Sequence, residues 1–395
     1  MTAPKWGGPW IGTVTTPVAV GLVAVGLVAV GFDGTLYVSS DAGHTWAVAT
    51  GVSDLAAGSA HQPDEEAGDT LTKAGFKAIS VAGVCYYPVC SAHNSSTGIR
   101  SFTNVGGTKT SGFFALPHLQ DFDTSDLFPA GAPMLKGWAT DDTNIYVLAL
   151  YATRTVCLQF PIADLANSVE IAGSATSPTP TSGAGVRDVG SYVMAGLVFF
   201  EGEVWCASWK SGFSGVRHLA PDATVWTDEA GTWTQTFKSL AVLGGDPDYL
   251  WVEVIQTGSN DRLLYTRSAA GVWALRSTAT LADSNNTLKL VWAGAGGKLL
   301  YQVVASDRTW KYTDDYGATW TAVGTASSAS NWGIVVAGPE RAGKVLISEG
   351  LWGATLEGHI HELDLVAKTL TDITGAFAPS MDQDDIGVLW FGEYE

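Results

Sequence analysis

Cysteine is scarce in this sequence. There are four cysteines among 395 residues, at positions 85, 90, 157 and 206, and no two of them show the CxxC spacing of a metal site. Four cysteines are too few to stabilise a chain of this length by disulfides, which excludes a disulfide-rich scaffold. Their spacing excludes a zinc ribbon. Cys85 and Cys90 flank the short stretch YYPV and could bridge a hairpin, whereas buried thiols are the simpler interpretation.

Basic residues are also few. Lys and Arg total 21 against 39 Asp and Glu, which gives a formal net charge of -18. A chain of this charge is repelled by phosphate backbones and by anionic lipid. We therefore expect neither nucleic acid nor a membrane surface as a partner.

Long hydrophobic runs are absent with one exception, residues 18–32, which read VAVGLVAVGLVAVGF. The run is shorter than the ~20 residues that a helix needs to span a bilayer, and glycine recurs in each of its units. We expect no membrane insertion and no signal peptide, and we interpret the run as one or two buried strands near the centre of the fold.

Glycine and aromatic residues are abundant, with 46 Gly, 16 Trp, 12 Tyr and 14 Phe. Four segments repeat one pattern, a short strand, a turn with small or acidic residues and Gly, and then a strand that begins at Trp46, Trp233, Trp273 or Trp320. This pattern is typical of a β-hairpin. The last three tryptophans are 40 and 47 residues apart, which is the length of one four-stranded propeller blade.

The sequence therefore predicts an all-β fold, a single β-propeller domain over residues 1–395 with about seven four-stranded blades, six or eight being the alternatives. The expected blades cover 17–50, 76–105, 132–170, 186–236, 238–277, 286–324 and 330–373, with 386–395 closing the ring against an N-terminal segment. The stretches 62–69 and 174–185 are expected to connect blades.

Two of the hairpins fit the pattern S/T-x-D-x-G-x-T-W. The residues are Ser39, Asp41, Gly43, Thr45 and Trp46 in the first, and Thr313, Asp315, Gly317, Thr319 and Trp320 in the second. This pattern resembles the Asp box, or BNR repeat, of the sialidase-like β-propellers, and the segments at Trp233 and Trp273 are degenerate copies. The resemblance implies that Asp41 and Asp315 are structural residues, placed away from any active site.

The catalytic motifs of that family do not occur in the sequence. No Arg-Ile-Pro occurs, the first arginine is Arg100 followed by Ser101, and no set of arginines aligns with the family's carboxylate-binding triad. The resemblance therefore implies a member without catalytic residues, which favours a binding or structural module over an enzyme.

The remaining candidate functional residues are possible metal ligands. Glu357, His359 and His361 alternate along EGHIHELD, so that in a strand they would share one face and could hold a metal, although an exposed polar face explains the same alternation. Calcium is the other candidate, at two clusters that are by default solvated turns: Asp121, Asp123 and Asp126, and Asp382, Asp384 and Asp385. No other cofactor is expected.

Two further motifs have ordinary interpretations. Residues 338–345, GPERAGKV, resemble a phosphate loop, but a strand follows where a helix is required, so we interpret them as a hairpin turn. Residues 212–218, GFSGVRH, place a serine near a histidine without the GxSxG pattern of a nucleophile elbow, and we interpret them as a loop.

These features favour a non-enzymatic binding or structural module. Our expectation is a component of a bacteriophage virion or tail, engaged in assembly or in recognition of a host-surface glycan, with other proteins of a larger assembly as its partners. An extracellular or a cytoplasmic location is the alternative. Two other functions stay open, a carbohydrate-active hydrolase with a carboxylate pair at the axial face, and an intracellular assembly factor that docks one protein partner.

Overall fold

The structure is a computed structural model. It describes residues 26–30, 36–41, 45–49, 78–89, 98–105, 108–115, 134–151, 154–167, 186–188, 193–210, 213–220, 223, 226–229, 237–256, 262–277, 288–303, 309–325, 334–350, 358–374 and 390–394. Within these ranges the chain forms 28 β-strands and one 3-10 helix, Ile162–Asn167. None of the described segments is a helix of the length and hydrophobicity that crossing a membrane requires.

The described strands pair into seven four-stranded antiparallel sheets, which we call blades A to G. Blade A contains β28 (Trp390–Tyr394), β1 (Gly26–Val30), β2 (Leu36–Ser39) and β3 (Ala47–Val48). Blade B contains β4 (Ile79–Val81), β5 (Val84–Val89), β6 (Gly98–Val105) and β7 (Thr108–Ala115). Blade C contains β8 (Met134–Thr140), β9 (Asn144–Tyr151), β10 (Arg154–Pro161) and β11 (Val186–Asp188).

The other four blades each use consecutive strands. Blade D contains β12 (Val193–Phe200), β13 (Glu203–Lys210), β14 (Phe213–Leu219) and β15 (Thr227–Glu229). Blade E contains β16 (Phe237–Leu243), β17 (Tyr249–Gln256), β18 (Arg262–Ser268) and β19 (Trp273–Ser277). Blade F contains β20 (Leu288–Gly294), β21 (Lys298–Val303), β22 (Thr309–Thr313) and β23 (Thr321–Thr325). Blade G contains β24 (Ile334–Arg341), β25 (Lys344–Gly350), β26 (Gly358–Asp364) and β27 (Thr369–Asp372).

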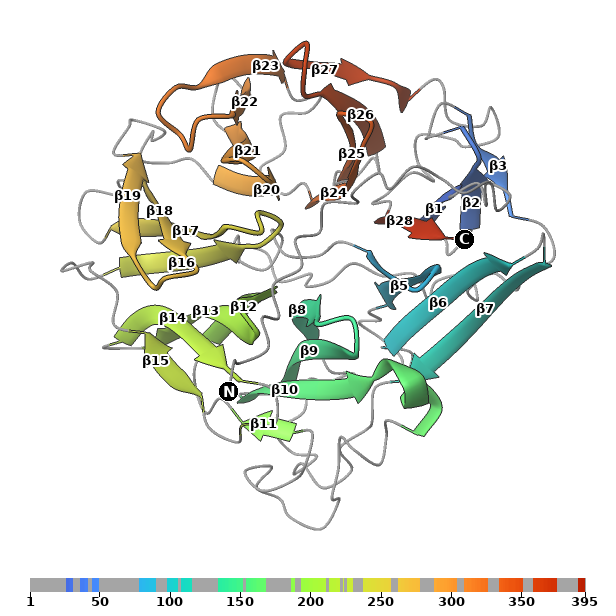
Figure 1. The fold of residues 1–395 in the computed structure, drawn as a ribbon, viewed down its shortest axis with the longest axis horizontal. Helices are drawn as coiled ribbons and strands as arrows, with labels where there is room; N and C mark the ends of the chain where they lie inside the picture. The colour runs from blue at the N-terminus through green and yellow to red at the C-terminus, as the bar shows by residue number, and fades with distance from the viewer. Residues whose placement is uncertain are drawn as a thin grey trace, which may run out of the picture.

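The blades follow one another around a central axis, with β8, β12, β16, β20, β24 and β28 toward the centre and β7, β11, β15, β19, β23 and β27 toward the rim (Figure 1). This architecture is a β-propeller. The prediction of an all-β propeller with about seven four-stranded blades is confirmed.

Ring closure joins the two ends of the described chain. Strand β28 pairs antiparallel with β1, so that Leu27 lies opposite Glu393 and Val30 opposite Trp390. Blade A therefore consists of three strands from the N-terminal part and one from the C-terminal part. The expected closing segment, 386–395, contains β28.

The innermost strands are bent by β-bulges. In blades C to G the register of the first strand shifts by a bulge, for example between Leu135 and Gly137 in β8 and between Ala195 and Leu197 in β12. A bulge bends a strand and increases its twist, which the crowded centre of a ring requires. Gly137 also permits close approach of blades C and D, because a Cβ there would lie 2.7 Å from the backbone nitrogen of Leu197.

Tight hairpins connect the first and second strands of the blades. Three of these turns are an X-Gly pair with positive φ at both residues, Ala82–Gly83, Glu201–Gly202 and Ala342–Gly343. This is the type I′ conformation, which matches the twist of the flanking strands. Because adjacent strands are antiparallel, the turns between third and fourth strands open on the same side of the ring, which we call the turn face.

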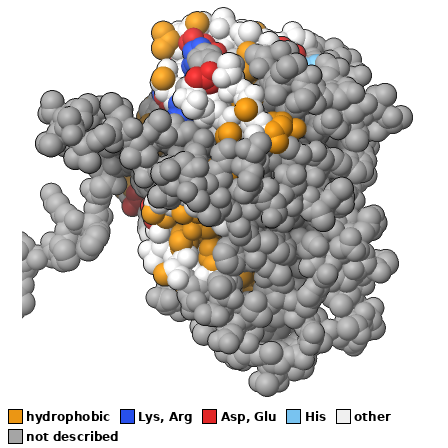
Figure 2. Space-filling model, turned by 90° about the vertical axis from the view of Figure 1, so that its right-hand side faces the viewer, with side chains coloured by type: hydrophobic (Ala, Val, Ile, Leu, Met, Phe, Trp, Pro, Cys, Tyr) orange, Lys and Arg blue, Asp and Glu red, His pale blue; other side chains and the backbone are white. Residues whose placement is uncertain are grey.

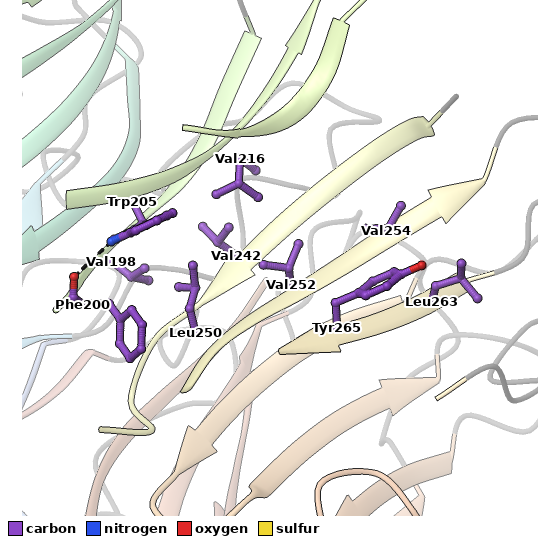
Figure 3. Packing of buried hydrophobic residues seen from close by; sticks show 11 residues of the cluster. Val198, Phe200, Trp205, Val216, Val242, Leu250, Val252, Val254, Leu263 and Tyr265 are labelled. Carbon is purple, nitrogen blue, oxygen red and sulfur yellow. Dashed lines mark hydrogen bonds between the residues drawn. The ribbon is translucent and has the colours of Figure 1, made fainter. Parts of the chain in front are cut away.

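The core lies between neighbouring blades, where the hydrophobic faces of two sheets meet. Between blades D and E, Trp205 and Val216 pack with Val242, Val252 and other buried residues of the facing sheet (Figure 3). The indole N–H of Trp205 donates to the carbonyl oxygen of Phe200 at 3.0 Å, so the ring is buried without an unsatisfied donor. Each fully buried side chain of this size contributes about 1.5–3 kcal/mol to folding.

One expected boundary between blades was wrong. Residues 186–188 were expected to begin the blade 186–236, but they form β11 and pair with β10 as the outer strand of blade C. The stretch 174–185 therefore connects two strands of one blade rather than two blades. Strand β7 also extends blade B to residue 115, beyond the expected end at 105.

Other expectations fall partly outside the described residues. Residues 26–30 of the hydrophobic run form β1, the strand next to the innermost position of blade A. Cys85, Cys157 and Cys206 are buried, whereas Cys90 is outside the described residues, so the Cys85–Cys90 bridge stays a prediction. The stretch 62–69 also lies outside them.

Candidate functional site

The Asp box of blade F is a turn between β22 and β23 closed by its own side chains. Asp315 accepts hydrogen bonds from the Thr319 N–H at 2.9 Å, from the Thr319 hydroxyl at 2.6 Å and from the Thr313 hydroxyl at 2.7 Å. The Gly317 N–H donates to the Thr313 hydroxyl at 3.0 Å. Tyr316 and Gly317 both have positive φ, 61° and 81°.

These donors change the acidity of the carboxyl group. The hydrogen bonds from the hydroxyl and N–H of Thr319 and from the hydroxyl of Thr313 lower the pKa of Asp315 to about 2. Asp315 is therefore ionised at neutral pH, and both of its oxygens already accept hydrogen bonds from the turn. This is the geometry of a turn-stabilising carboxylate, not of a general acid.

The Asp box of blade A repeats the same bonds between β2 and β3. Asp41 accepts from the Thr45 N–H at 2.8 Å, from the Thr45 hydroxyl at 2.6 Å and from the Ser39 hydroxyl at 2.7 Å. Trp46, which follows the turn, is buried, and Gly43 lies outside the described residues. The two turns thus have the same pattern of hydrogen bonds to the aspartate. Membership of the Asp-box family stays a prediction.

The predicted metal ligands His359 and His361 lie on one face of β26, with ring centroids 6.1 Å apart. Each ring faces a carboxylate: His359 Nδ1 is 3.0 Å from Asp372 Oδ2, and His361 Nε2 is 3.2 Å from Glu349 Oε2. Burial alone would raise the pKa of Asp372, but hydrogen bonds from Thr374 and His359 hold it below its usual value. The third predicted ligand, Glu357, lies outside the described residues.

This arrangement is that of two histidine–carboxylate pairs at the contact between blades F and G. His361 and Glu349 are buried, and the ring of His361 is 5.9 Å from that of Trp310 in β22. Across the described part of the chain, no group of three or more His, Cys, Asp or Glu is placed to hold a metal ion. The metal site at Glu357, His359 and His361 stays a prediction.

The calcium predictions are not tested by the structure. Asp121, Asp123 and Asp126, and Asp382, Asp384 and Asp385, all lie outside the described residues.

A second cluster of charged residues joins blades D and E and was not predicted. His218 in β14 has both ring nitrogens toward carboxylates, with Nδ1 2.7 Å from Glu203 Oε2 and Nε2 3.7 Å from Glu229 Oε2. Glu229 Oε1 accepts from Arg267 Nε at 2.9 Å and from the Trp273 indole N–H at 3.2 Å. Since Arg267 and Trp273 belong to blade E, Glu229 links the two blades.

An aromatic ring lies at the centre of this cluster. Trp205 stacks on His218 with ring centroids 4.5 Å apart, and the guanidinium carbon of Arg267 lies 4.4 Å from the centroid of the Trp205 ring. A cation over an indole ring gains about 0.5–2 kcal/mol, more as water is excluded. The cluster therefore strengthens the contact between blades D and E at the turn face.

A buried carboxylate with a different environment lies between blades E and F. Asp246, in the turn between β16 and β17, accepts from the Asp248 N–H at 3.0 Å and from the Trp251 indole N–H at 3.3 Å. Burial raises the pKa of Asp246 even though these donors act to lower it. In the described chain, Asp246 is an acid whose pKa is raised at an interblade contact.

Both motifs with an ordinary interpretation lie in hairpins or strands. The segment 338–345 contains the end of β24, the turn Ala342–Gly343 and the start of β25, and the antiparallel pairing of these strands confirms the hairpin. Lys344 Nζ lies 2.5 Å from Glu362 Oε1 of β26. The interpretation of 212–218 as a loop was wrong, because Phe213–Leu219 is strand β14. Its histidine, His218, belongs to the D–E cluster.

The residues that sequence reasoning missed are those whose partners lie far away in the chain. Arg267 and Glu229 are 38 residues apart, and Trp273 and Glu229 are 44 residues apart. This separation is about one blade, so a search for charged or aromatic side chains one blade apart could have found them.

Comparison with known proteins gives similarity at the level of structure only. No family model matches the sequence, and no curated protein matches it. A putative 6-phosphogluconolactonase from Bacteroides fragilis is similar with a TM-score of 0.49 and 12% identity, over 94% of this chain and 98% of that one.

Two further similar structures are a puromycin-hydrolyzing peptidase from Mycobacterium tuberculosis and TolB from Acinetobacter baumannii. The first has a TM-score of 0.49 and 11% identity over 88% of this chain, and the second a TM-score of 0.40 and 10% identity over 75%. This chain covers 50% of that peptidase and 62% of that TolB chain. At these identities no activity is carried over to this chain.

Proposed function

We propose that this β-propeller is a non-enzymatic binding module that recognises a glycan as part of a larger protein assembly. The observation that carries the proposal is the use of charged side chains to join neighbouring blades. Glu229 pairs with Arg267 between blades D and E, and Lys368 Nζ lies 2.8 Å from Asp314 Oδ2 between blades G and F. Such contacts make a rigid platform, which is what recognition on a preorganised surface requires.

The surface is consistent with this use. Figure 2 shows the ring from the side of its right-hand edge in Figure 1, where acidic and basic side chains lie side by side at the upper end and hydrophobic side chains lie in separate groups. Val272 and Val366, in turns of blades E and G, expose 62% and 86% of their area.

The proposed setting is a bacteriophage virion or tail that faces a host surface, with other proteins of the particle as partners. This setting is supported by the sequence pattern of the two Asp boxes alone. An intracellular assembly factor would use the same rigid ring to dock one protein.

The test is a binding screen of the full chain on a glycan array, paired with a hydrolysis assay on the same oligosaccharides. We expect binding to a defined set of glycans without release of products. Turnover of a bound glycan would overturn the non-enzymatic proposal, and the absence of glycan binding would overturn the recognition of glycans.

A carbohydrate-active hydrolase is the second candidate, and one observation favours it. The raised pKa of the buried Asp246 is a property of a general acid. In that case an Asp246→Asn variant loses hydrolysis while it still binds glycan. A hydrolase would also need a second carboxylate ~5–10 Å away, depending on whether the mechanism retains or inverts.

A further inference from the structure

Arg276 has an unusual environment near the turn face, between blades E and F. It belongs to β19, the outermost strand of blade E, and its guanidinium carbon lies 5.2 Å from the centroid of the Tyr249 ring and 4.9 Å from that of the Tyr316 ring. Its Nε donates to the Thr266 hydroxyl at 2.8 Å. The guanidinium is therefore held by two rings and one hydrogen bond.

The two rings form a frame that spans both blades. Tyr249 begins β17 of blade E, and Tyr316 lies in the Asp-box turn of blade F, with ring centroids 5.1 Å apart and planes at 74°. The position of Tyr316 is fixed on its other side, because a Cβ on Gly297 would lie 2.6 Å from the Tyr316 ring. Substitution of Gly297 would therefore displace the frame.

Among the described residues, Arg276 has no carboxylate partner, in contrast to several other cations. Five described cations pair with acids: Arg217 with Asp228, Arg267 with Glu229, Lys298 with Glu340, Lys344 with Glu362, and Lys368 with Asp314. Among the residues that the structure describes, no carboxylate lies within ion-pair distance of Arg276, and its two terminal NH₂ groups have no hydrogen-bond partner. In a chain of net charge -18, this is a cation left open to an external anion.

The chemistry of such a group is specific. A guanidinium carries five N–H donors in a fixed fork, and one of them, on Nε, is already used by Thr266. The terminal NH₂ groups present parallel N–H bonds that match the two oxygens of a carboxylate. Because the rings and Thr266 already fix the side chain, little conformational entropy is lost when an anion binds.

The two rings that flank the guanidinium also carry hydroxyl groups. Burial, and then the negative charge of Asp246, raise the pKa of Tyr316, so its hydroxyl stays protonated at neutral pH. Within the described ranges, neither the Tyr249 nor the Tyr316 hydroxyl has a hydrogen-bond partner. An aromatic ring with a polar end suits a sugar, which presents both apolar and hydroxyl groups.

We propose that Arg276, framed by Tyr249 and Tyr316, binds the carboxylate of an acidic sugar on the turn face between blades E and F. This site rests on the glycan-binding function proposed above and names the class of glycan. The net charge of the protein opposes an anionic ligand at long range, so the short bidentate contact with the guanidinium carries the affinity.

The test uses isothermal titration of the full chain with a galacturonic acid oligosaccharide, the matching neutral galactose oligosaccharide, and acetate, at about 0.15 M salt, where charges are screened beyond about 8 Å. We expect saturable binding of the acidic oligosaccharide, with the neutral one at least about tenfold weaker because it lacks the charge-assisted bonds. Acetate is expected to bind weakest, since it lacks the sugar. Equal affinity for the acidic and the neutral oligosaccharide would overturn the proposal.

Variants separate this site from the rest of the surface. Arg276→Gln is expected to lose about tenfold or more in affinity for the acidic oligosaccharide, and Tyr316→Phe, which keeps the ring, a smaller factor. Lys298→Gln is the control, because it changes the net charge by the same amount at a cation already paired with Glu340. Its affinity for the acidic oligosaccharide is expected to lie within about twofold of that of the unmodified protein. The melting temperature of each variant shows that it is folded.

The outcomes also distinguish the two proposals. If glycans bind on the array but Arg276→Gln binds them as the unmodified protein does, the Arg276 site is overturned and the binding function stands. If no glycan binds, both are overturned.

Discussion

At the scale of single residues, Asp315 determines how one turn responds to acid. Its pKa of about 2 in the folded protein lies below the value of about 3.9 in an unfolded chain. A group with a lowered pKa stabilises the fold above its unfolded pKa, and this stabilisation is lost as the pH falls from about 4 through about 2. We expect Asp315→Asn to lose less stability than the unmodified protein between about pH 6 and about pH 3.

Denaturant unfolding at both pH values measures this effect. Glu201→Gln, at an exposed carboxylate, is the control, and this variant should follow the pH dependence of the unmodified protein. An unchanged pH dependence in Asp315→Asn would show that the hydrogen bonds from Thr313 and Thr319 do not stabilise the turn.

Glu229 is the residue that ties blade D to blade E. Glu229→Gln removes the charge that Arg267 pairs with and weakens the bond from Trp273, and we expect a loss of about 1–3 kcal/mol in the free energy of unfolding. Asp228→Asn, which breaks the more exposed pair with Arg217, should cost less than about 1 kcal/mol. Equal losses in the two variants, measured by urea unfolding, would contradict a special role of Glu229.

At the scale of elements, the X-Gly hairpins depend on backbone conformation alone. Gly202 has a φ of 80°, and a Cβ added there would meet no atom within 4 Å. Gly202→Ala should therefore destabilise the protein by about 1 kcal/mol through backbone strain only. Glu201→Gly, at a φ of 52°, should be neutral or stabilising by the same reasoning, and thermal unfolding of both variants tests the pair.

The hairpins are the elements that could be predicted from the sequence. The side-chain hydrogen bonds of the Asp box in blade F join residues two to four positions apart, so the pattern from Thr313 to Trp320 contains the residues that make them. Strand β11 was assigned to the wrong blade because its partner β10 is separated from it by a long connection, and local periodicity does not show which sheet a short strand joins.

The interblade clusters were much less predictable, because their members lie far apart in the sequence. Arg276 meets Tyr316 across a blade boundary, 40 residues further along the chain, and Arg267 meets Glu229 across another. Such contacts are set by the packing of neighbouring sheets and not by local sequence. Turn chemistry was therefore predicted from the sequence, whereas the interblade clusters needed the structure.

At the scale of the whole molecule, the ring depends on the pairing of β28 with β1. Without β28, blade A would lose its innermost strand, and β1 would present an unpaired edge toward the axis. The ends of the described chain would no longer be joined, and the contacts of blade A with its neighbours would weaken. The pairing of β28 with β1 therefore holds the ring closed.

Hydrogen exchange read by mass spectrometry, on the full chain and on a variant that ends at residue 389, measures the effect of this pairing. We expect the amides of Gly26–Val30 to be protected in the full chain and to exchange much faster in the truncated one, while strands of blade E, such as Tyr249–Gln256, change little. Unchanged protection of Gly26–Val30 after removal of β28 would contradict a ring closed by these two strands.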